Sequence, residues 1–114
     1  MKNLFAIITF AVILISFSSN SEAASTEQSL CDYINVDNKS KLRSYLKSNR
    51  LKIRNLFKGT SCNGKNILEF AGEKNAINTG KMIIGKLSKK VVAQLLPTLA
   101  STNLAAIAEK RVNG

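Results

Sequence analysis

The sequence predicts an all-α protein, a small compact domain of about five short helices closed by one disulfide and preceded by an N-terminal signal peptide. Three observations predict this fold. Apolar residues recur at spacings of three and four rather than two, and no segment shows the alternation of a half-buried strand. The chain contains a single proline, Pro97. It also contains two cysteines, Cys31 and Cys62, which can form one intramolecular pair only.

The first 23 residues have the order of a secretory signal peptide. Lys2 gives a short positive start, an uncharged apolar run follows from Leu4 to Phe17, and a small polar stretch ends at Ala23. The apolar run has about fourteen residues, whereas a permanent membrane helix needs about twenty. We therefore expect a protein exported to the periplasm or the extracellular space, with one mature helical domain over residues 24–114. An uncleaved membrane anchor is the alternative.

Cys31 and Cys62 are expected to form a disulfide, because paired cysteines in a small exported domain are usually oxidised. The bond would close a loop of about thirty residues, and chain-entropy arguments assign about 3–4 kcal/mol of stabilisation to a loop of that length. A redox-active pair is the alternative, but the spacing is not that of a Cys-x-x-Cys motif.

The first two helical segments are placed by their caps. A capping box at Ser25 is expected to begin the first helix. Asp37 or Asn38 can cap the next segment, which extends to Gly59 as one long helix or as two helices with a break near Ser48-Asn49. Its apolar residues form one stripe, made by Leu42, Tyr45, Leu46, Ile53, Leu56 and Phe57.

A turn at Asn63-Gly64 is expected to separate this half from the next helices, because Asn-Gly accepts positive φ readily. Asn66 can cap a helix that ends near Asn75, and another helix begins at about Asn78. Gly80 and Gly85 lie within this later helix. Since glycine costs helix stability, both are expected to mark close packing against a neighbour.

The last part of the domain contains a stretch without charge, residues 91–108. Ser88 can cap a helix that Pro97 halts, and a final helix is expected over about 102–111. The stretch is therefore interpreted as a pair of short helices closing the core. A partner-binding surface or an interfacial membrane helix are the alternatives, and the second lacks the usual Lys and Arg on its polar side.

The sequence carries no recognisable catalytic or metal-binding constellation, so we expect no enzyme activity, no cofactor and no metal. The chain has no histidine, the usual general base and the commonest metal ligand. Glu69 and Glu73 stand four residues apart on one helix face and could form an acid pair or a cation site. With Lys65 and Lys74 nearby, a solvated face is the favoured interpretation.

The strongest positive signal is a basic segment without acids between Asp37 and Glu69. Six cations are spaced 4, 4, 3, 4 and 4 residues apart, so a continuous helix would place them on one stripe: Lys39, Arg43, Lys47, Arg50, Arg54 and Lys58. Lys41 and Lys52 add charge outside the stripe. Like charges four residues apart repel each other by a few tenths of a kcal/mol. Binding an anion is one reason to accept that repulsion, and a solvated face is the alternative.

The net charge of +10 belongs entirely to the mature domain, because Lys2 and Glu22 cancel within the signal peptide. Such a charge favours anionic partners. An anionic lipid or lipopolysaccharide surface fits the expected compartment, whereas nucleic acid is disfavoured because few aromatic residues are available for stacking. A protein-interaction module of the envelope, such as an inhibitor or immunity-type factor, is the alternative. It would use the uncharged C-terminal surface or the turn at Asn63-Gly64.

The chain from Leu30 to about Leu87 resembles a family of small exported proteins from marine gammaproteobacteria that is classed as a domain of unknown function. The features that carry the resemblance are Leu30-Cys31, Leu42-Arg43 with Leu46, Cys62-Asn63-Gly64, and Leu68 with Phe70-Ala71. The resemblance implies a periplasmic or secreted bacterial protein with no assigned activity and no catalytic residues. The segment after Ser88 departs from the family pattern.

The segment from Gly64 to Ile84 also resembles a single ankyrin unit, with Leu68, Ala71 and Asn75 at the positions of its core and turn residues. One such unit cannot bury its own faces. The likeness therefore implies only that two helices pack against each other around a turn.

Overall fold

The computed structural model describes the backbone of residues 21–114 and the side chains of residues 26–114. Apart from its last three residues, the signal peptide predicted over residues 1–23 lies outside the described residues. None of the helices within residues 21–114 combines the length and the apolar character needed to span a membrane.

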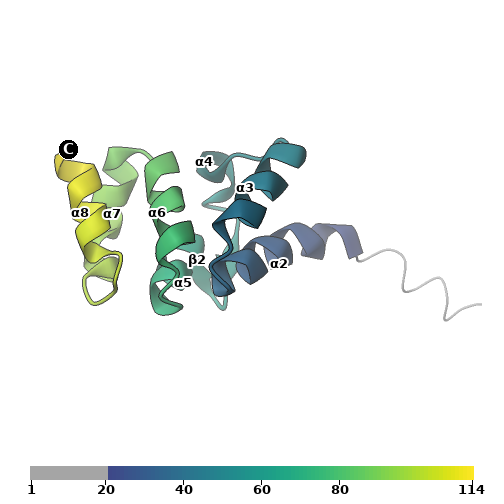
Figure 1. Cartoon of the computed structure of the whole chain (residues 1–114), viewed down its shortest axis with the longest axis horizontal. Coiled ribbons are helices and arrows are strands. Elements are labelled where there is room, and N and C mark those ends of the chain that lie inside the picture. Colours follow the sequence, from purple (N-terminus) through teal and green to yellow (C-terminus); the bar gives the residue numbers. More distant parts are fainter. Residues whose placement is uncertain (1–20) are drawn as a thin grey trace, which may run out of the picture.

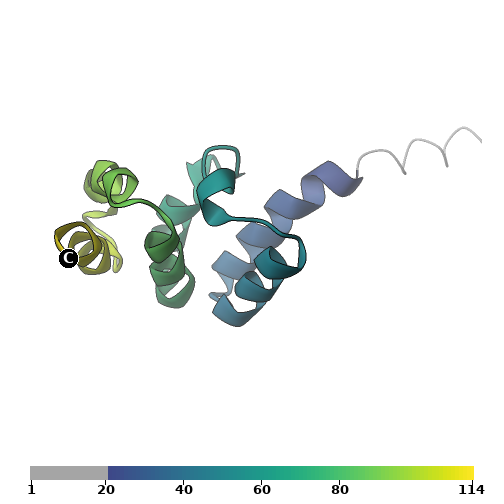
Figure 2. The ribbon, with the colours of Figure 1, turned by 90° about the horizontal axis from the view of Figure 1, so that it is seen from above.

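Seven α-helices and one two-stranded hairpin form the described part of the chain. In order they are α2 (Ser21–Asn35), α3 (Lys39–Ser48), α4 (Ile53–Leu56), β1 (Ser61–Cys62), β2 (Lys65–Asn66), α5 (Ile67–Glu73), α6 (Ile77–Lys86), α7 (Lys89–Leu99) and α8 (Ala105–Asn113). Figure 1 shows the helices side by side, from the oblique α2 at one end to the α7–α8 pair at the other. Figure 2 shows this pair nearly end-on beside α6. The predicted all-α fold is confirmed.

Three predicted helix caps are confirmed. The Asn38 side chain accepts a hydrogen bond from the backbone N–H of Lys41 at 3.1 Å, at the start of α3. Asn66 caps α5 and Ser88 caps α7 in the same way, at 2.8 and 3.2 Å. Each side chain satisfies a backbone donor that the helix itself leaves free. The start of α2 differs from the prediction, because this helix begins at Ser21 rather than at Ser25.

Three helices end in the same way, on a residue with left-handed backbone geometry. Asp37, Arg50 and Asn75 follow α2, α3 and α5 and have φ values of 54°, 54° and 55°. At each position a pair of backbone hydrogen bonds returns to the last turn, the pattern of a Schellman motif. Asp and Asn tolerate this geometry better than most residues. Arginine has no such advantage, so Arg50 occupies its position at a cost to stability.

The predicted disulfide is confirmed, with the Cα atoms of Cys31 and Cys62 5.7 Å apart. It joins α2 to β1. The predicted turn is the two-residue connection of the β1–β2 hairpin, in which Asn63 and Gly64 have φ values of 54° and 76°. Positive φ at both central residues is typical of the tight turns that fit the twist of paired strands. The short pairing of β1 with β2 is a feature that the sequence did not predict.

One hydrophobic core runs through all parts of the described chain. Its fully buried members come from α2, α3, α5, α6, α7, the α7–α8 connection and α8, and they include Leu30, Ile34, Leu42, Ile67, Leu68, Ile83, Ile84, Val92, Leu99, Leu104 and Ala108. The uncharged stretch therefore supplies two helices that close the core, as predicted. Pro97 does not halt α7, which continues to Leu99. Proline lacks a backbone N–H, so α7 loses one backbone hydrogen bond at Pro97 and continues for two more residues.

The two α6 glycines differ in their surroundings. A Cβ atom on Gly80 would lie 2.6 Å from the side chain of the buried Leu104, so this glycine allows the α7–α8 connection to approach α6. Gly85 has no neighbouring atom within 4 Å of such a Cβ. The expectation of close packing is therefore confirmed at Gly80 and wrong at Gly85, which is exposed to solvent.

Asp37 ties the α2–α3 turn to the first residues of α6. Its carboxylate accepts hydrogen bonds from the backbone N–H groups of Asn78 and Thr79, at 3.2 and 2.7 Å, and from both of their side chains, at 3.0 Å each. Partial burial alone would raise the pKa of Asp37, but these donors outweigh it and hold the pKa below its ordinary value of 3.8. Asp37 thus acts as a cap for a helix that lies 41 residues further along the chain.

Candidate anion-binding surface

The basic segment is divided into two helices at Arg50. The backbone N–H of Arg50 donates to the carbonyl oxygen of Lys47 at 3.2 Å, and that of Leu51 donates to Leu46 at 2.8 Å. The Asn49 side chain also donates to the carbonyl oxygen of Tyr45 at 2.8 Å. These bonds end α3, and the chain turns before α4 starts at Ile53. The single continuous helix is therefore wrong, and the alternative with a break is correct.

The break creates a pocket between α3, α4 and α6, which we call the basic pocket. Its volume is about 470 Å³. Five cations and four apolar residues line it: Arg43, Lys47, Lys52, Arg54 and Lys86, with Leu46, Leu51, Ile53 and Met82. All five cationic side chains are exposed to solvent, whereas Leu46 and Ile53 are buried. The pocket therefore has an apolar floor that belongs to the core and a cationic rim.

Half of the predicted stripe lies around this pocket. Arg43, Lys47 and Arg54 line it, whereas the other three members, Lys39, Arg50 and Lys58, do not. Two cations outside the predicted stripe complete the rim. The sequence could have placed Lys52 among the rim cations if two helices had been predicted instead of one. The turn between the two helices reorients the residues that follow it. Lys86 lies on α6, and no local signal in the sequence relates it to α3.

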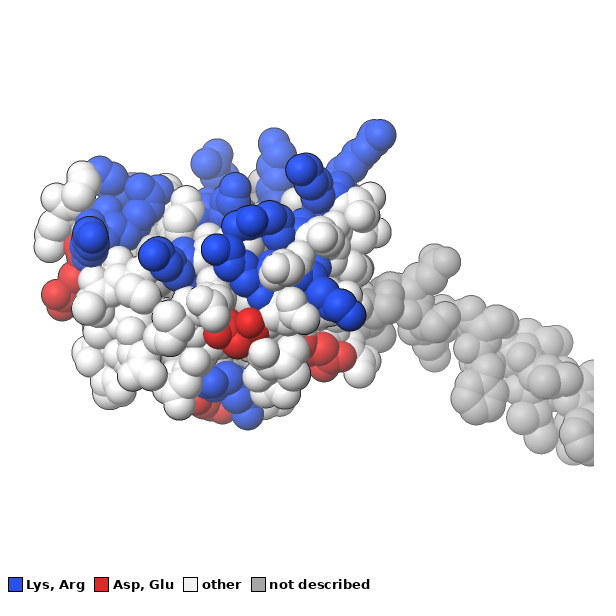
Figure 3. Space-filling view, viewed as in Figure 1, with Lys and Arg blue, Asp and Glu red and all other residues white. Residues whose placement is uncertain are grey.

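The cations of the described chain gather along one edge of the molecule. Figure 3 shows Lys and Arg side chains crowded along the upper edge of the view, where α4, the last turns of α3, α6 and α8 and the first turn of α7 lie in Figure 1. The lower part of this face is mostly white, and the few charged side chains there include the Asp and Glu of this view. This distribution follows from the topology, because α3, α6 and α8 end at that edge and α7 begins there (Figure 1). We call this cation-rich edge of the molecule the basic edge.

Internal ion pairs between the described side chains do not neutralise this charge. Among residues 26–114, the one ion pair between side chains joins Lys65 to Glu73, away from the basic pocket. The five cations of the pocket rim also donate no side-chain hydrogen bond to any described residue. Their N–H groups are therefore available to a ligand or to solvent.

Helix dipoles account for only part of the basic edge. Lys47, Lys86 and Lys110 lie in the last turns of α3, α6 and α8, where a positive charge complements the free carbonyl groups. Lys89 and Lys90 lie at the start of α7, where the dipole disfavours a cation. Lys89 compensates by donating to the main-chain oxygen of Gly114 at 2.8 Å. Helix stability alone therefore does not explain the position of Lys90.

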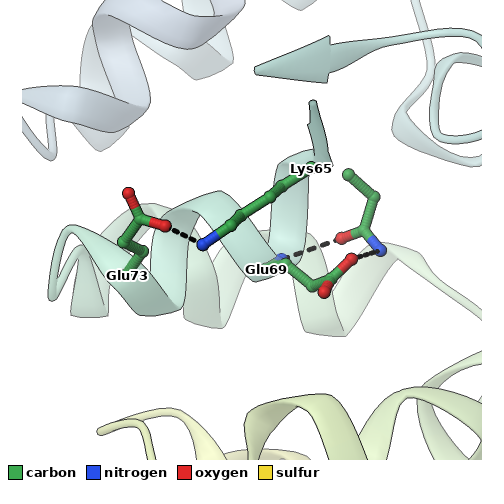
Figure 4. A network of polar contacts seen from close by, with 4 residues as sticks. Lys65, Glu69 and Glu73 are labelled. Carbon is green, nitrogen blue, oxygen red and sulfur yellow. Dashed lines mark hydrogen bonds and ion pairs between the residues drawn. The ribbon is translucent and has the colours of Figure 1, made fainter. Parts of the chain in front are cut away.

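The acid pair of α5 serves local structure. Lys65 pairs with Glu73, while Glu69 accepts a hydrogen bond at 2.7 Å from the side chain of the capping residue Asn66 (Figure 4). The hydrogen bond and the charge of Lys65 lower the pKa of Glu73. The two carboxylates thus face different partners, as expected for a solvated helix face. Within residues 26–114, no three Cys, Asp or Glu side chains are grouped as metal ligands.

A second pocket lies beside the disulfide and has a different character. Its volume is about 540 Å³. Residues from α2, the hairpin and α5 line it: Glu27, Gln28, Cys31, Asp32, Asn35, Ser61, Cys62, Asn63, Phe70 and Lys74. Glu27 accepts a hydrogen bond from the backbone N–H of Ser61 at 3.2 Å and so fixes α2 on the hairpin. Asn63 of the predicted Asn63-Gly64 turn lines this pocket, and Lys74 is its only lining cation.

The fold and its surface define a small helical domain with one disulfide, a basic edge and a basic pocket open to solvent. Comparison by sequence then places the chain in a family. The family described as "Protein of unknown function (DUF3718)" matches residues 30–93, more than half of the 114 residues, and the chain belongs to this family. The match includes every residue that lines the basic pocket. No curated protein and no solved structure matches the chain.

Proposed function

We propose that this protein is exported, has no enzymatic activity, and binds an anionic component of the cell envelope through the basic edge, with the basic pocket at its centre. The observation that carries the proposal is the rim of five cations from three separate segments, none of which is paired with an acid among the described residues. Such an arrangement concentrates positive potential over one part of the surface.

Export is supported by two independent features. The N-terminal residues have the order of a signal peptide, and the chain forms a disulfide between its only two cysteines. Disulfides persist mainly in oxidising compartments such as the periplasm and the extracellular space. In a bacterial envelope, phosphate groups of lipids and lipopolysaccharide are the anions within reach.

The alternative, a protein-interaction module, has less support in the described surface. Interfaces with proteins are usually centred on exposed aromatic or large apolar residues. Among the described residues, Val36 is the one large apolar residue that is strongly exposed, with 68% of its surface accessible. The exposed positions of α7 and α8 are mainly small or polar, as at Ala93, Gln94 and Ala106.

The proposal is tested with vesicles that contain anionic phospholipid, compared with neutral vesicles, in a salt titration. The wild-type protein should bind the anionic vesicles only, and more weakly as salt rises. The variant Arg43→Gln/Lys47→Gln/Arg54→Gln removes three rim charges. Since one cation near an anionic membrane contributes about 1 kcal/mol, the affinity should fall about 100-fold.

A matched control removes the same number of charges outside the pocket, at Lys39→Gln/Lys41→Gln/Lys58→Gln. This control should bind at least about tenfold more tightly than the pocket variant, because its net charge is the same while the rim is intact. Circular dichroism and thermal unfolding establish that both variants are folded. If the wild-type protein binds neither anionic vesicles nor lipopolysaccharide at low salt, the proposed function is wrong.

A further inference from the structure

The floor of the basic pocket is more apolar than binding to a polyanion requires. Leu46 and Ile53 are 8% and 3% exposed and belong to the core, while Leu51 and Met82 are half-buried beside them. A protein that only attracts phosphate needs cations on a solvated ridge. Here the cations surround a hollow, and the hollow reaches down to the apolar core.

The position of the floor follows from the end of α3. In the Schellman motif at Arg50, the residue after the left-handed position, Leu51, folds back toward Leu46 through its backbone hydrogen bond. Met82 from α6 and Ile53 from α4 complete the apolar lining. Methionine is flexible and polarisable, which suits a wall that must adapt to a chain-like ligand.

The size and the charge of the pocket indicate one kind of occupant. A volume of about 470 Å³ lies within the range of roughly 300–1,000 Å³ typical of small-ligand sites. Two of the rim cations, Arg43 and Arg54, are arginines, whose planar guanidinium groups bind phosphate through two parallel hydrogen bonds. An apolar ligand alone would leave this rim unused, and a bare anion would leave the floor unused.

We propose that the basic pocket takes up part of the acyl chain of a single anionic lipid, whose phosphate group lies among the five rim cations. This inference rests on the proposed function and makes it more specific, since it assigns binding to individual lipid molecules rather than to a charged surface as a whole. The family match covers the entire pocket, whereas most of the α7–α8 pair lies beyond it.

Methionine labelling makes the proposal directly testable, because the chain contains only two methionines, Met1 and Met82. The full-length protein carrying methyl-labelled methionine is titrated with monoacyl glycerol phosphates of increasing chain length, below their micelle concentrations. The Met82 methyl signal should shift at saturation. Affinity should rise by up to about fourfold for each added methylene that becomes buried, until the pocket is full.

Polar substitution of the floor separates the acyl chain from the charge. Met82→Gln keeps all five cations, so it should retain binding to anionic vesicles at low salt but lose the dependence on chain length. Leu51→Gln should act in the same way and replaces Met82→Gln if that variant does not fold. Val36→Gln makes the same kind of change at an exposed site away from the pocket and should leave the chain-length dependence unchanged.

Four results would contradict the inference, and each is distinct. If anionic vesicles bind but affinity for monoacyl phosphates does not depend on chain length, the acyl site is wrong and the proposed function stands. If neutral monoacyl glycerols bind as tightly as the phosphates, the rim has no role in lipid recognition. If inorganic phosphate shifts the Met82 signal as much as the lipids do, the pocket binds phosphate only. If vesicles and lipids both fail to bind, the proposed function falls as well.

Discussion

Opposite charges lie at the two ends of α6, and within the described residues only the negative one is held by hydrogen bonds. At the first residues of the helix, the carboxylate of Asp37 accepts four hydrogen bonds from Asn78 and Thr79. At the last turn, Lys86 has no acidic partner among the described residues and lines the basic pocket. Both charges have the sign that the helix dipole favours.

The two ends differ in how the free backbone groups of the helix find their hydrogen-bond partners. At the end of α6, the guanidinium of Arg111 already donates to the carbonyl oxygen of Leu87 at 2.9 Å. The end of α6 therefore has a cationic hydrogen-bond donor without Lys86, and Lys86 adds a further positive charge there. Charge that is satisfied inside the fold contributes to stability, whereas unsatisfied charge at a pocket is available for binding. The comparison predicts that a change at the Asp37 end affects stability and that a change at the Lys86 end affects binding.

The largest effect on stability is expected from Asp37→Ala. The substitution leaves the fully buried Thr79 hydroxyl and two backbone N–H groups without their acceptor, and it places alanine at a positive φ. The loss of unfolding free energy should be about 2–4 kcal/mol by chemical denaturation. Asp37→Asn, which tolerates the same φ, should lose less. Vesicle binding by the folded variant should equal that of the wild type, and a parallel loss of binding would contradict the comparison.

The same carboxylate predicts a pH dependence. The hydrogen bonds from Asn78 and Thr79 hold the pKa of Asp37 below its value in the unfolded chain. Its contribution to stability is therefore fully present above the ordinary pKa of 3.8 and is lost as the pH falls through the lower, folded value. Unfolding curves measured between neutral and strongly acidic pH should show this loss in the wild type and a smaller loss in Asp37→Asn.

A smaller pair of effects, of opposite sign, is expected from the two glycines of α6. Gly80→Ala places a Cβ against the fully buried Leu104 and should cost about 1–3 kcal/mol, because the Leu104 side chain must shift within the core. Gly85→Ala meets no atom and should stabilise the protein by about 0.4–1 kcal/mol. Thermal unfolding of the two variants in parallel checks the signs. Destabilisation by Gly85→Ala would indicate a packing constraint at the basic end.

The smallest effect on stability is expected from Lys86→Gln. Loss of one favourable charge at a helix end should change the unfolding free energy by less than about 1 kcal/mol. Affinity for anionic vesicles should fall about fivefold, as for one cation at a membrane surface. If Lys86→Gln destabilises the protein as much as Asp37→Ala does, the charge at the end of α6 is structural and the comparison fails.

Features that depend on neighbouring residues in the sequence were predictable. The caps at Asn38, Asn66 and Ser88 use a side chain three residues before its backbone partner, so the sequence alone contains the signal. The Cys31–Cys62 bond was predictable because two cysteines allow only one pairing.

Features that depend on tertiary packing were not predictable. The end of α3 is set by left-handed geometry at Arg50, a residue that does not favour it, so the sequence allowed both one long helix and two helices. The rim of the pocket requires Lys86 to lie near α3 and α4, which depends on how α6 packs. Gly85 resembles Gly80 in the sequence, and only their surroundings distinguish them.

The disulfide encloses one wall of the pocket in a covalent ring. Residues 31 and 62 are joined, and α3 and α4 both lie between them. If this wall separates from α6, its two ends stay together, so it gains only the conformational freedom of a loop closed on itself. Reducing the bond would remove that restraint from residues 31–62, which include the whole of α3 and α4. Amide exchange in a reducing buffer should therefore accelerate first in the pocket wall and later in α6 to α8, which lie outside the ring.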